Sequence, residues 1–359
     1  MGPNGTAGHL SEEARWYLAH RQVRDMTEIA RGEPGSQEMP IPQDLVSSLV
    51  AKAARAPSVH NTQPWRFEAG RQGLELRADH GRDLPRIDPA GREILVSCGA
   101  ALFGLRLAIR ELRYRPAVRL LPDPADPSLL ARVRLGAPAP MTGDERQLLT
   151  AMPHRHTHRG AFSPEPISAG LLAALQHDAM AEDATLVLID RPASYQQLAA
   201  LVSAADQEQR ENAAVRAEVR RWTRPAGSLA RDGVPAHAFP RRRGHLTGRL
   251  AQRDFDLDRG LGLLDSGGAP PATTAILITA TDSAADWLHA GQALHRLLLR
   301  AASRWVFASL HSQPLEAPAI RAEIQTCLAL PGVPQMLLQL GHSHTAAATA
   351  RRRPGELLS

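Results

Sequence analysis

The chain has 359 residues, 43% of them hydrophobic, which is enough for one large domain or two ordinary ones and excludes a globally disordered protein. The formal net charge is +5, and its arginines are interleaved with acids, which argues against a nucleic-acid-binding surface. No apolar run is long enough to span a membrane and no secretory signal pattern opens the chain, so we expect a cytoplasmic protein. Cys98 and Cys327 stand in apolar, helix-like contexts, which indicates free thiols.

The first predicted elements are helices and short strands. Pro42 suits the first turn of a helix, and the turn between Gly70 and Gly73 favours a hairpin. Asp88 and Pro89 are typical of a helix start. In chain order we predict a helix near 11–30, a helix at 41–55, strands near 64–69 and 73–79, a helix at 88–112, strands near 117–121 and 131–135, and a helix at 142–151.

An irregular stretch at 152–166 separates these elements from those predicted in the rest of the chain. Residues 222–270 are rich in Gly, Pro and Arg and show little periodicity, which is typical of a lid or a binding loop. Around them we predict helices at 168–181, 192–221, 284–304 and near 316–328, and strands at 184–189, 273–280 and 335–341.

Two predicted helices carry an internal repeat. GAALFGLRL at 99–107 and GQALHRLLL at 291–299 share the pattern G-x-A-L-x-x-L-x-L. Two buried helices can share leucine and alanine spacing by chance. The alternative is a duplicated chain with halves near 40–150 and 151–350.

The stretch HRHTHRGAF at 154–162 gathers two arginines and a hydroxyl before a predicted helix. Arg155, Thr157 and Arg159 suit a phosphate monoester, because guanidinium groups bind phosphate oxygens in pairs and a hydroxyl adds a hydrogen bond. The same residues also fit a solvated basic loop. Three alternating histidines would share one face of a strand, but no carboxylate or cysteine cluster accompanies them to complete a metal site.

The stretch APSVHNTQPWRF at 56–67 is dense in polar side chains. Ser58, Asn61 and Gln63 offer hydroxyl and amide groups that can hydrogen-bond the edge of a flat heteroaromatic ring. A capped helix end followed by a turn explains the same residues equally well. A catalytic pair of Ser58 and His60 is a weaker alternative, because the G-x-S-x-G turn that presents such a serine is missing.

These two stretches together resemble the FMN-dependent nitroreductases. PSVHNTQPWRF is similar to the family signature P-S-x-x-N-x-Q-P-W-x-F, and RHTHRGAF is similar to the phosphate motif R-[RH]-[ST]-x-[RK]-x-F with one extra residue before Phe162. The sequence RRRPGELL is similar to the basic-Pro-acidic tail of the family. In ordinary members the phosphate motif comes first, whereas here it follows the other motif.

The reversed order fits a fused duplication. Ordinary nitroreductases are intertwined homodimers, in which one subunit supplies the phosphate motif and the other supplies P-S-x-x-N. Fusion of two copies would leave one composite FMN site, an arrangement that resembles the Acg subfamily. Further stretches similar to that subfamily are DPAGREILVSCGAAL, DGVPAHAF, DWLHAGQAL and GVPQMLLQLG.

The resemblance implies an α+β, nitroreductase-like fold of two fused pseudo-repeats that form an internal pseudo-dimer. It further implies an N-terminal extension at 1–40, a first half at 41–150, and a second half at 151–359 with a lid-like insertion at 222–270. The chain would act as a monomeric pseudo-dimer or as a homodimer of it.

The motifs also carry site roles. The resemblance implies that the first and last arginines of the phosphate motif bind the FMN phosphate, with a hydroxyl from its threonine, and that the tail adds two more arginines. His156 stands where the subfamily usually has arginine, and His158 where it often has aspartate or asparagine. The implied cofactor-binding residues are Pro57, Ser58, Asn61, Arg155, His156, Thr157, Arg159, Gln313, Arg352 and Arg353. The stretch 310–313 corresponds roughly to the loop whose N–H faces flavin N5.

The implied activity is hydride transfer from NAD(P)H through FMN to an unknown acceptor, without a catalytic side chain and without a metal. No nucleic acid or membrane partner is expected. One alternative is a protein that binds or sequesters FMN under a lid with little turnover. Another is a biosynthetic dehydrogenase that oxidises its substrate through FMN.

Overall fold

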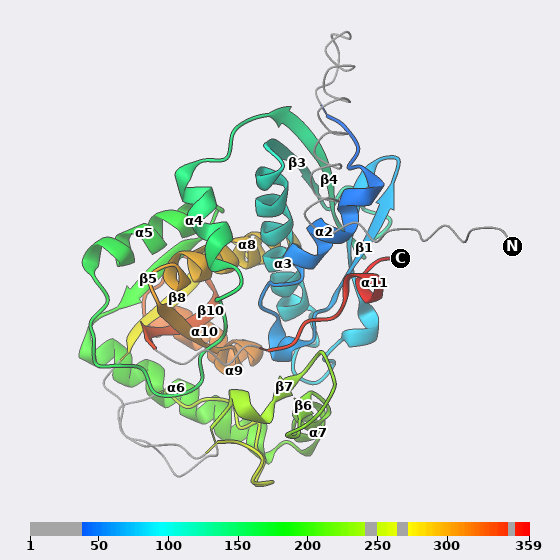
Figure 1. Cartoon of the computed structure of the whole chain (residues 1–359). Helices are drawn as coiled ribbons and strands as arrows, with labels where there is room; N and C mark the ends of the chain where they lie inside the picture. The colour runs from blue at the N-terminus through cyan, green and yellow to red at the C-terminus, as the bar shows by residue number, and fades with distance from the viewer. Residues whose placement is uncertain (1–37, 241–249, 264–271, 344–348) are drawn as a thin grey trace, which may run out of the picture.

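The structure, a computed structural model, describes residues 38–240, 250–263, 272–343 and 349–359 (Figure 1). The helix predicted near 11–30 lies outside these residues. Within them the chain is α+β, with two four-stranded antiparallel sheets and a helical layer between and around them.

The first half follows the predicted order of elements. Pro42 precedes the first helix, Gly73 takes a left-handed φ of 123° at the hairpin, and a Thr142–Glu145 capping box opens the last helix. The elements are α2 (Gln43–Ala53), β1 (Trp65–Gly70), β2 (Gly73–Ala78), α3 (Arg92–Glu111), β3 (Tyr114–Leu120), β4 (Leu129–Pro138) and α4 (Gly143–Ala151), with short 3₁₀ turns at Val59–Asn61 and His80–Arg82.

The second half adds elements that the pattern did not predict. These are the strands β6, β7 and β9 and the short helices α9 and α11. Its elements are α5 (Ala169–Met180), β5 (Thr185–Ile189), α6 (Pro192–Glu211), α7 (Ala213–Arg221), β6 (Thr223–Arg224), β7 (Val234–Pro235), a 3₁₀ turn (Ala236–Ala238), β8 (Thr273–Thr279), α8 (Ala284–Ala302), β9 (Val306–His311), α9 (Gln313–Glu316), α10 (Pro318–Cys327), β10 (Val333–His342) and α11 (Pro354–Leu357).

Both sheets have the same topology. The first is ordered β1-β2-β4-β3 and the second β5-β8-β10-β9, so in each half the strands lie in the order first, second, fourth, third. In each half a long helix, α3 or α8, joins the second strand to the third. A chance likeness of two leucine-rich helices does not produce a shared sheet order, and the prediction of two fused pseudo-repeats is therefore confirmed.

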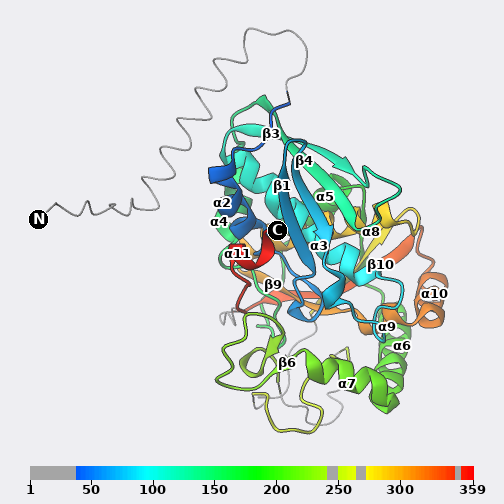
Figure 2. The same cartoon turned by 90° about the vertical axis from the view of Figure 1, so that its right-hand side faces the viewer.

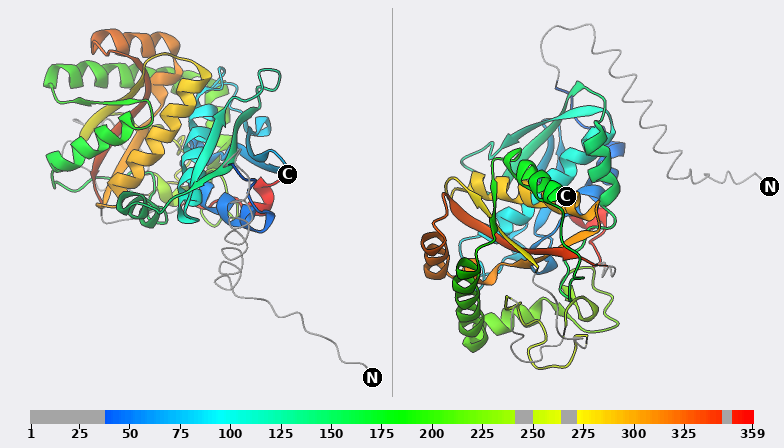
Figure 3. Two further views of the ribbon diagram at one scale, coloured as in Figure 1. Left: turned by 90° about the horizontal axis from the view of Figure 1, so that it is seen from above. Right: turned by 90° about the vertical axis from the view of Figure 1, so that its left-hand side faces the viewer.

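The two long helices pack against each other at the centre of the molecule (Figure 3). The repeated glycines of the predicted duplication, Gly99 and Gly291, meet at this crossing. A Cβ on Gly99 would stand 2.2 Å from the carbonyl oxygen of Leu288, and one on Gly291 would stand 2.0 Å from that of Val96. Glycine is required at both positions because any side chain would push the helices apart.

The helix predicted over 192–221 is two helices. Asn212 ends α6 and caps α7, because its Oδ1 accepts hydrogen bonds from the amides of Ala214 and Val215. The resulting bend turns α7 away from its own half and toward the first half (Figure 1).

The described residues of 222–263 form what we call the lid segment. Trp222, Phe239 and Phe255 build a small apolar cluster that also includes Leu84 and Ile87 from the connection between β2 and α3. The lid segment belongs to the second half by sequence, yet it packs on the first half.

The end of the described chain also crosses to the first half (Figure 2). Leu357 of α11 is fully buried in the core around α2 and β1, and the Ser359 amide donates to the Phe67 carbonyl at 3.1 Å. The first half therefore completes its packing with residues of the second.

Candidate functional site

A cavity lies at the junction of the two halves and the lid segment. It holds about 70 Å³ of water-accessible space inside a hollow of about 710 Å³. The first half contributes the motif 57–60 and three residues of α3, and the second half contributes the phosphate motif, α8, β9 and β10. Its lining is Pro57, Ser58, Val59, His60, Glu93, Val96, Ser97, Thr157, Arg159, Gln252, Arg253, Phe255, Leu294, Ser309, Leu310, Ser312, Gln313 and Met336.

The loop that follows α2 reaches this cavity in a strained conformation. His60, Asn61 and Gln63 all have left-handed φ angles, of 46°, 55° and 51°. Such a conformation costs on the order of 1–3 kcal/mol for each non-glycine residue. The Ser58 hydroxyl accepts a hydrogen bond from the Gln63 amide at 3.0 Å and holds the bend closed. Strain of this kind, concentrated in one loop at a cavity, is typical of a binding site.

The amide side chains of Asn61 and Gln63 hydrogen-bond the loop to distant parts of the chain. Asn61 donates to the Gly233 carbonyl at 3.0 Å and accepts from Arg351 Nη1 at 3.0 Å. Gln63 donates to the Arg231 carbonyl at 2.8 Å and accepts from the Arg352 amide at 2.7 Å. Asn61 and Gln63 thus join the loop to the lid segment and the tail, and neither is part of the cavity lining.

His60 does not support the alternative of a catalytic pair with Ser58. Neither nitrogen of its buried ring has a hydrogen-bond partner among the described residues. Its ring meets Phe255 edge to face at 5.2 Å. Burial lowers the His60 pKa well below its ordinary value, helped by Arg253 and Arg159, so the imidazole is neutral.

Arg155 is the most unusual cation of the site. It is 7% exposed, and its Nη2 donates to the Arg55 carbonyl at 3.0 Å. Its Nε and Nη1 are buried without a partner in the described part of the chain. A buried guanidinium with two unused donors is unfavourable by itself, and a phosphate group is the kind of ligand that would satisfy both donors.

The charged groups that act on Arg155 are other cations, so they do not neutralise its charge. Burial, followed by repulsion from Arg351 and Arg55, lowers its pKa to about 9. Burial, followed by Arg55, lowers the Arg351 pKa to about 10, and burial with repulsion from Arg155 lowers the pKa of His295 to about 3. The unpartnered donors of Arg155 and the cations around it have the chemistry that would fit the phosphate of a flavin mononucleotide.

The remaining phosphate-motif residues lie on the cavity side. Thr157 and the half-buried Arg159 line the cavity, and the Arg159 guanidinium stands over the Phe255 ring at 5.4 Å. Burial lowers the Arg159 pKa to about 10. Thr157 and Arg159 thus belong to the cavity lining, whereas Arg155 does not.

The motif's buried histidines serve packing. The His156 ring lies 4.1 Å from that of Phe307, and the His158 ring lies 4.8 Å from that of Phe162. No group of three or more His, Cys, Asp or Glu side chains suited to a metal occurs among residues 38–240, 250–263, 272–343 and 349–359.

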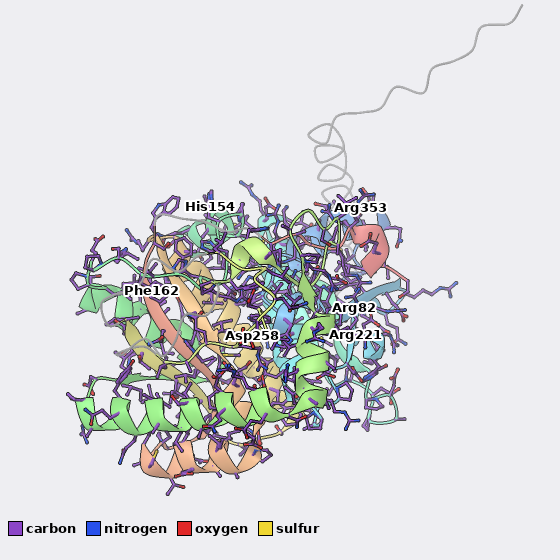
Figure 4. All side chains as sticks on the ribbon, turned by 90° about the horizontal axis from the view of Figure 1, so that it is seen from below. Arg82, His154, Phe162, Arg221, Asp258 and Arg353 are labelled. Carbon is purple, nitrogen blue, oxygen red and sulfur yellow. The ribbon has the colours of Figure 1, made fainter. Side chains whose placement is uncertain are left out.

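The tail reaches the site through Arg351, which the sequence did not single out. Arg352 is instead held by Gln63, by Asp79 at 3.4 Å and by the Glu356 carbonyl at 2.6 Å. Arg353 is exposed at the surface, where Figure 4 labels it, and its backbone amide donates a hydrogen bond to the Glu356 carboxylate. Of the three consecutive arginines, only Arg351 stands within electrostatic reach of Arg155.

The end of β9 and the start of α9 lie on the cavity. Leu310, Ser312 and Gln313 are in its lining. Gln313 is 1% exposed, and its amide donates to Asp206 at 3.3 Å.

The lid segment narrows the cavity. Gln252, Arg253 and Phe255 line it, and Arg253 forms a buried ion pair with Glu316 at 2.6 Å. Pockets for small organic ligands usually measure about 300–1,000 Å³, so the water-accessible space of about 70 Å³ is small for such a ligand. The sequence indicated a lid or binding loop over residues 222–270 as a whole, but no periodic pattern singled out residues 252–255 within it.

Glu93 is a further cavity residue without a sequence signal. It is 2% exposed and pairs with Arg92. Burial raises the Glu93 pKa to about 7, against the effect of Arg92 and with help from Glu316 and Asp88.

Among the described residues, no helix is both long enough and apolar enough to cross a membrane.

Comparison with known proteins gives the family. Residues 37–114 match the nitroreductase family. A Mycobacterium tuberculosis H37Rv protein named "Putative NAD(P)H nitroreductase Rv3131" is 32% identical over 308 residues, which cover 83% of this chain and 85% of that protein. A second relative from that strain, given the same description and the name acg, is 26% identical over 298 residues, 83% of this chain and 89% of its own length.

Among solved structures, a BluB-like flavoprotein of Clostridium difficile 630 aligns with a TM-score of 0.39 and 13% identity, over 59% of this chain and 97% of its own. A Bacteroides fragilis nitroreductase with bound FMN aligns with a TM-score of 0.33 and 14% identity, over 57% and 92%. By its similarity to the curated relatives along most of its length, the chain belongs to the nitroreductase family.

Proposed function

We propose that the protein is an FMN-dependent NAD(P)H oxidoreductase with one composite flavin site per chain. The observation that carries the proposal is the buried guanidinium of Arg155, which has two unpartnered donors and lies beside Arg351. The relatives named NAD(P)H nitroreductases and the bound FMN of the Bacteroides fragilis protein support the choice of cofactor.

In this proposal the residues of the site share three tasks. Arg155, Arg351 and Arg159 hold the phosphate, with Thr157 as the hydroxyl donor. Pro57 and Ser58 of the first half, with residues 310–313 of the second, form the walls around the ring. Bound FMN would supply the hydride chemistry, accepting from NAD(P)H and donating to a second substrate.

The other implied contacts fall into two groups. Asn61 supports the site by fixing Arg351, and Gln313 is buried in the cavity wall. His156, Arg352 and Arg353 contribute through packing, tail anchoring and surface charge respectively, since each has contacts away from the cavity. This division refines the implied roles of these five residues and keeps Arg155 at the centre.

The absorption spectrum of the purified protein tests the proposal. We expect a yellow protein with one FMN per chain, and Arg155→Ala should lose it. Full flavin retention in Arg155→Ala would refute the phosphate assignment. Two FMN per chain would refute a single composite site.

The lid segment favours a second candidate, an FMN-sequestering protein with little turnover. Arg253 and Phe255 cover the cavity, and the Arg253–Glu316 pair fastens them. Anaerobic mixing with NADPH or NADH separates the two candidates. Fast bleaching of the flavin band identifies a reductase, whereas bleaching by dithionite alone identifies a sequestering protein. A dehydrogenase would also resist NADPH and NADH, and it would differ from a sequestering protein because its own organic substrate bleaches the flavin.

We further propose that the protein works in the cytoplasm as a monomeric pseudo-dimer. Cys98 and Cys327 are both free, which suits a reducing compartment. Light scattering of the purified protein distinguishes a single chain from a homodimer of it.

A further inference from the structure

A second cavity, outside the flavin site, is lined mainly by arginines. It holds about 350 Å³ of water-accessible space on the face shown in Figure 4, where Arg82 and Arg221 lie next to one another. Arg66 and Arg82 come from the first half, Arg221 and Arg224 from α7 and β6, and Arg352 from the tail. Neither Arg155 nor Arg351 lines it.

The cavity carries an excess of positive charge. Its lining contains five arginines but only two carboxylates, Asp79 and Asp232. Asp79 lies 3.3 Å from Arg66, 3.6 Å from Arg82 and 3.4 Å from Arg352, so one carboxylate is shared by three cations. The two carboxylates of the lining therefore neutralise only part of its positive charge, and Glu218 and Glu356, outside the lining, interact with Arg221 and Arg352.

The second carboxylate is shared as well. Asp232 accepts from Arg82 at 2.9 Å and from Arg224 at 2.8 Å. Burial would raise the Asp232 pKa, but these two hydrogen bonds hold it below the usual value. Burial and repulsion from Arg82 lower the Arg352 pKa, which is the response expected of a cation crowded by others.

Trp222 fixes the positions of three of these cations. The guanidiniums of Arg82, Arg221 and Arg224 lie 5.6, 5.7 and 5.7 Å from its ring centre. The indole is 4% exposed, so it supports the arginines from below and offers no free face for a stacked base. A ligand of this cavity would be recognised by its charge.

We propose that this cavity is a second anion site that binds a pyrophosphate group. Several arginines around one hollow can give paired hydrogen bonds to more than one phosphate unit, and the uncompensated charge requires a multiply negative ligand. Either a nicotinamide dinucleotide or free pyrophosphate can supply that group. A bound anion would join the first half, the lid segment and the tail, because all three provide arginines.

Titration calorimetry on the full chain, as purified, tests the proposal with inorganic pyrophosphate, NADPH and NADH in separate experiments. The test variant is Arg66→Gln combined with Arg221→Gln, since both side chains are well exposed and their removal leaves the fold intact. The control is Arg220→Gln, an exposed neighbour on α7 that does not line the cavity.

We expect the wild type and the control to bind pyrophosphate alike and the test variant to bind at least tenfold more weakly, with unchanged flavin content. A dinucleotide that binds the wild type more tightly than pyrophosphate and loses that affinity in the test variant identifies the nucleotide as the source of the group. Tighter binding of pyrophosphate, or dinucleotide binding that the test variant keeps, identifies free pyrophosphate. Equal binding by wild type and test variant, or no binding by the wild type, would overturn the proposal.

The flavin-site variant Arg155→Ala separates the two anion sites. It should bind pyrophosphate like the wild type even if it holds no flavin. Loss of pyrophosphate binding in Arg155→Ala would show that the anion occupies the flavin-phosphate site and would also overturn the proposal.

Discussion

Gly99 of α3 and Gly291 of α8 lie against each other where the two central helices cross. A Cβ on Gly291 would stand 2.9 Å from the Cα of Gly99. The same position of the repeat thus supplies both sides of one contact, as expected where a former subunit interface has become an internal one.

Gly291→Ala should lower the free energy of unfolding by at least about 1–3 kcal/mol, the usual cost of overpacking a core. The added methyl would meet the Val96 carbonyl, which belongs to a helix backbone and has no room to move. Urea denaturation measures the change. Gly170→Ala in α5, where a Cβ meets nothing within 4 Å, is the control and should stabilise by about 0.5–1 kcal/mol. Equal effects of the two substitutions would contradict this account of the crossing.

Arg155→Met should have opposite effects on the flavin-bound and flavin-free chains. It removes charge-assisted hydrogen bonds worth about 1.5–3 kcal/mol, so FMN affinity should fall at least tenfold. It also removes a buried guanidinium with two unused donors, so the flavin-free chain should melt at the same temperature or higher. Fluorescence titration with FMN and thermal melts measure the two effects, with Arg220→Gln as the control. A flavin-free variant that melts well below the wild type would show that Arg155 is a structural residue.

Glu316→Gln should release the lid segment. Arg253 and Glu316 are 8% and 2% exposed, and loss of one partner of a buried ion pair leaves an uncompensated charge that costs about 3–5 kcal/mol. Hydrogen exchange should become faster at residues 250–257, and FMN should dissociate faster. The double variant Arg253→Met, Glu316→Leu restores a neutral contact and should recover the slow exchange. Unchanged exchange in Glu316→Gln would show that the pair does not fasten the lid segment.

Glu93 should make the protein less stable as the pH rises from about 4.5 to about 7. Burial raises the Glu93 pKa in the folded protein to about 7 from its ordinary value of 4.5, so the folded state holds its proton more tightly than the unfolded state. The advantage is present below the ordinary pKa and is lost as the pH passes the folded pKa. Urea denaturation of wild type and Glu93→Gln between pH 4 and pH 8 measures it, because the variant lacks this group. Parallel pH profiles for the two proteins would contradict the raised pKa.

Local signals were sufficient for most of the fold. Pro42 and the turn before Gly73 each favour one conformation, and the structure has it. The missed strand β9 had no such signal. It follows α8 after a sharp turn made by Trp305 with a φ of 56°, a conformation that a bulky residue rarely adopts and that no Gly or Pro announces.

The predicted site depended on contacts that sequence cannot supply. The tail carries three identical residues in a row, and neighbours in an extended chain point to opposite sides, so sequence alone does not separate Arg351 from Arg352. Likewise the sequence shows the hydrogen-bonding capacity of Asn61 and Gln63, but only the structure shows that lid and tail use it. The residues of the motif were identified from a pattern, and their partners were not.

The hydrogen bonds between the strained loop and the tail form only after the tail has been synthesised. Asn61 and Arg351 are 290 residues apart, so at about 5–20 residues per second the loop leaves the ribosome tens of seconds before its partner exists. Until then the loop lacks the contacts that hold His60, Asn61 and Gln63 in their left-handed conformations. The cavity therefore becomes complete only after the second half has been made, and a nascent first half should have no affinity for flavin.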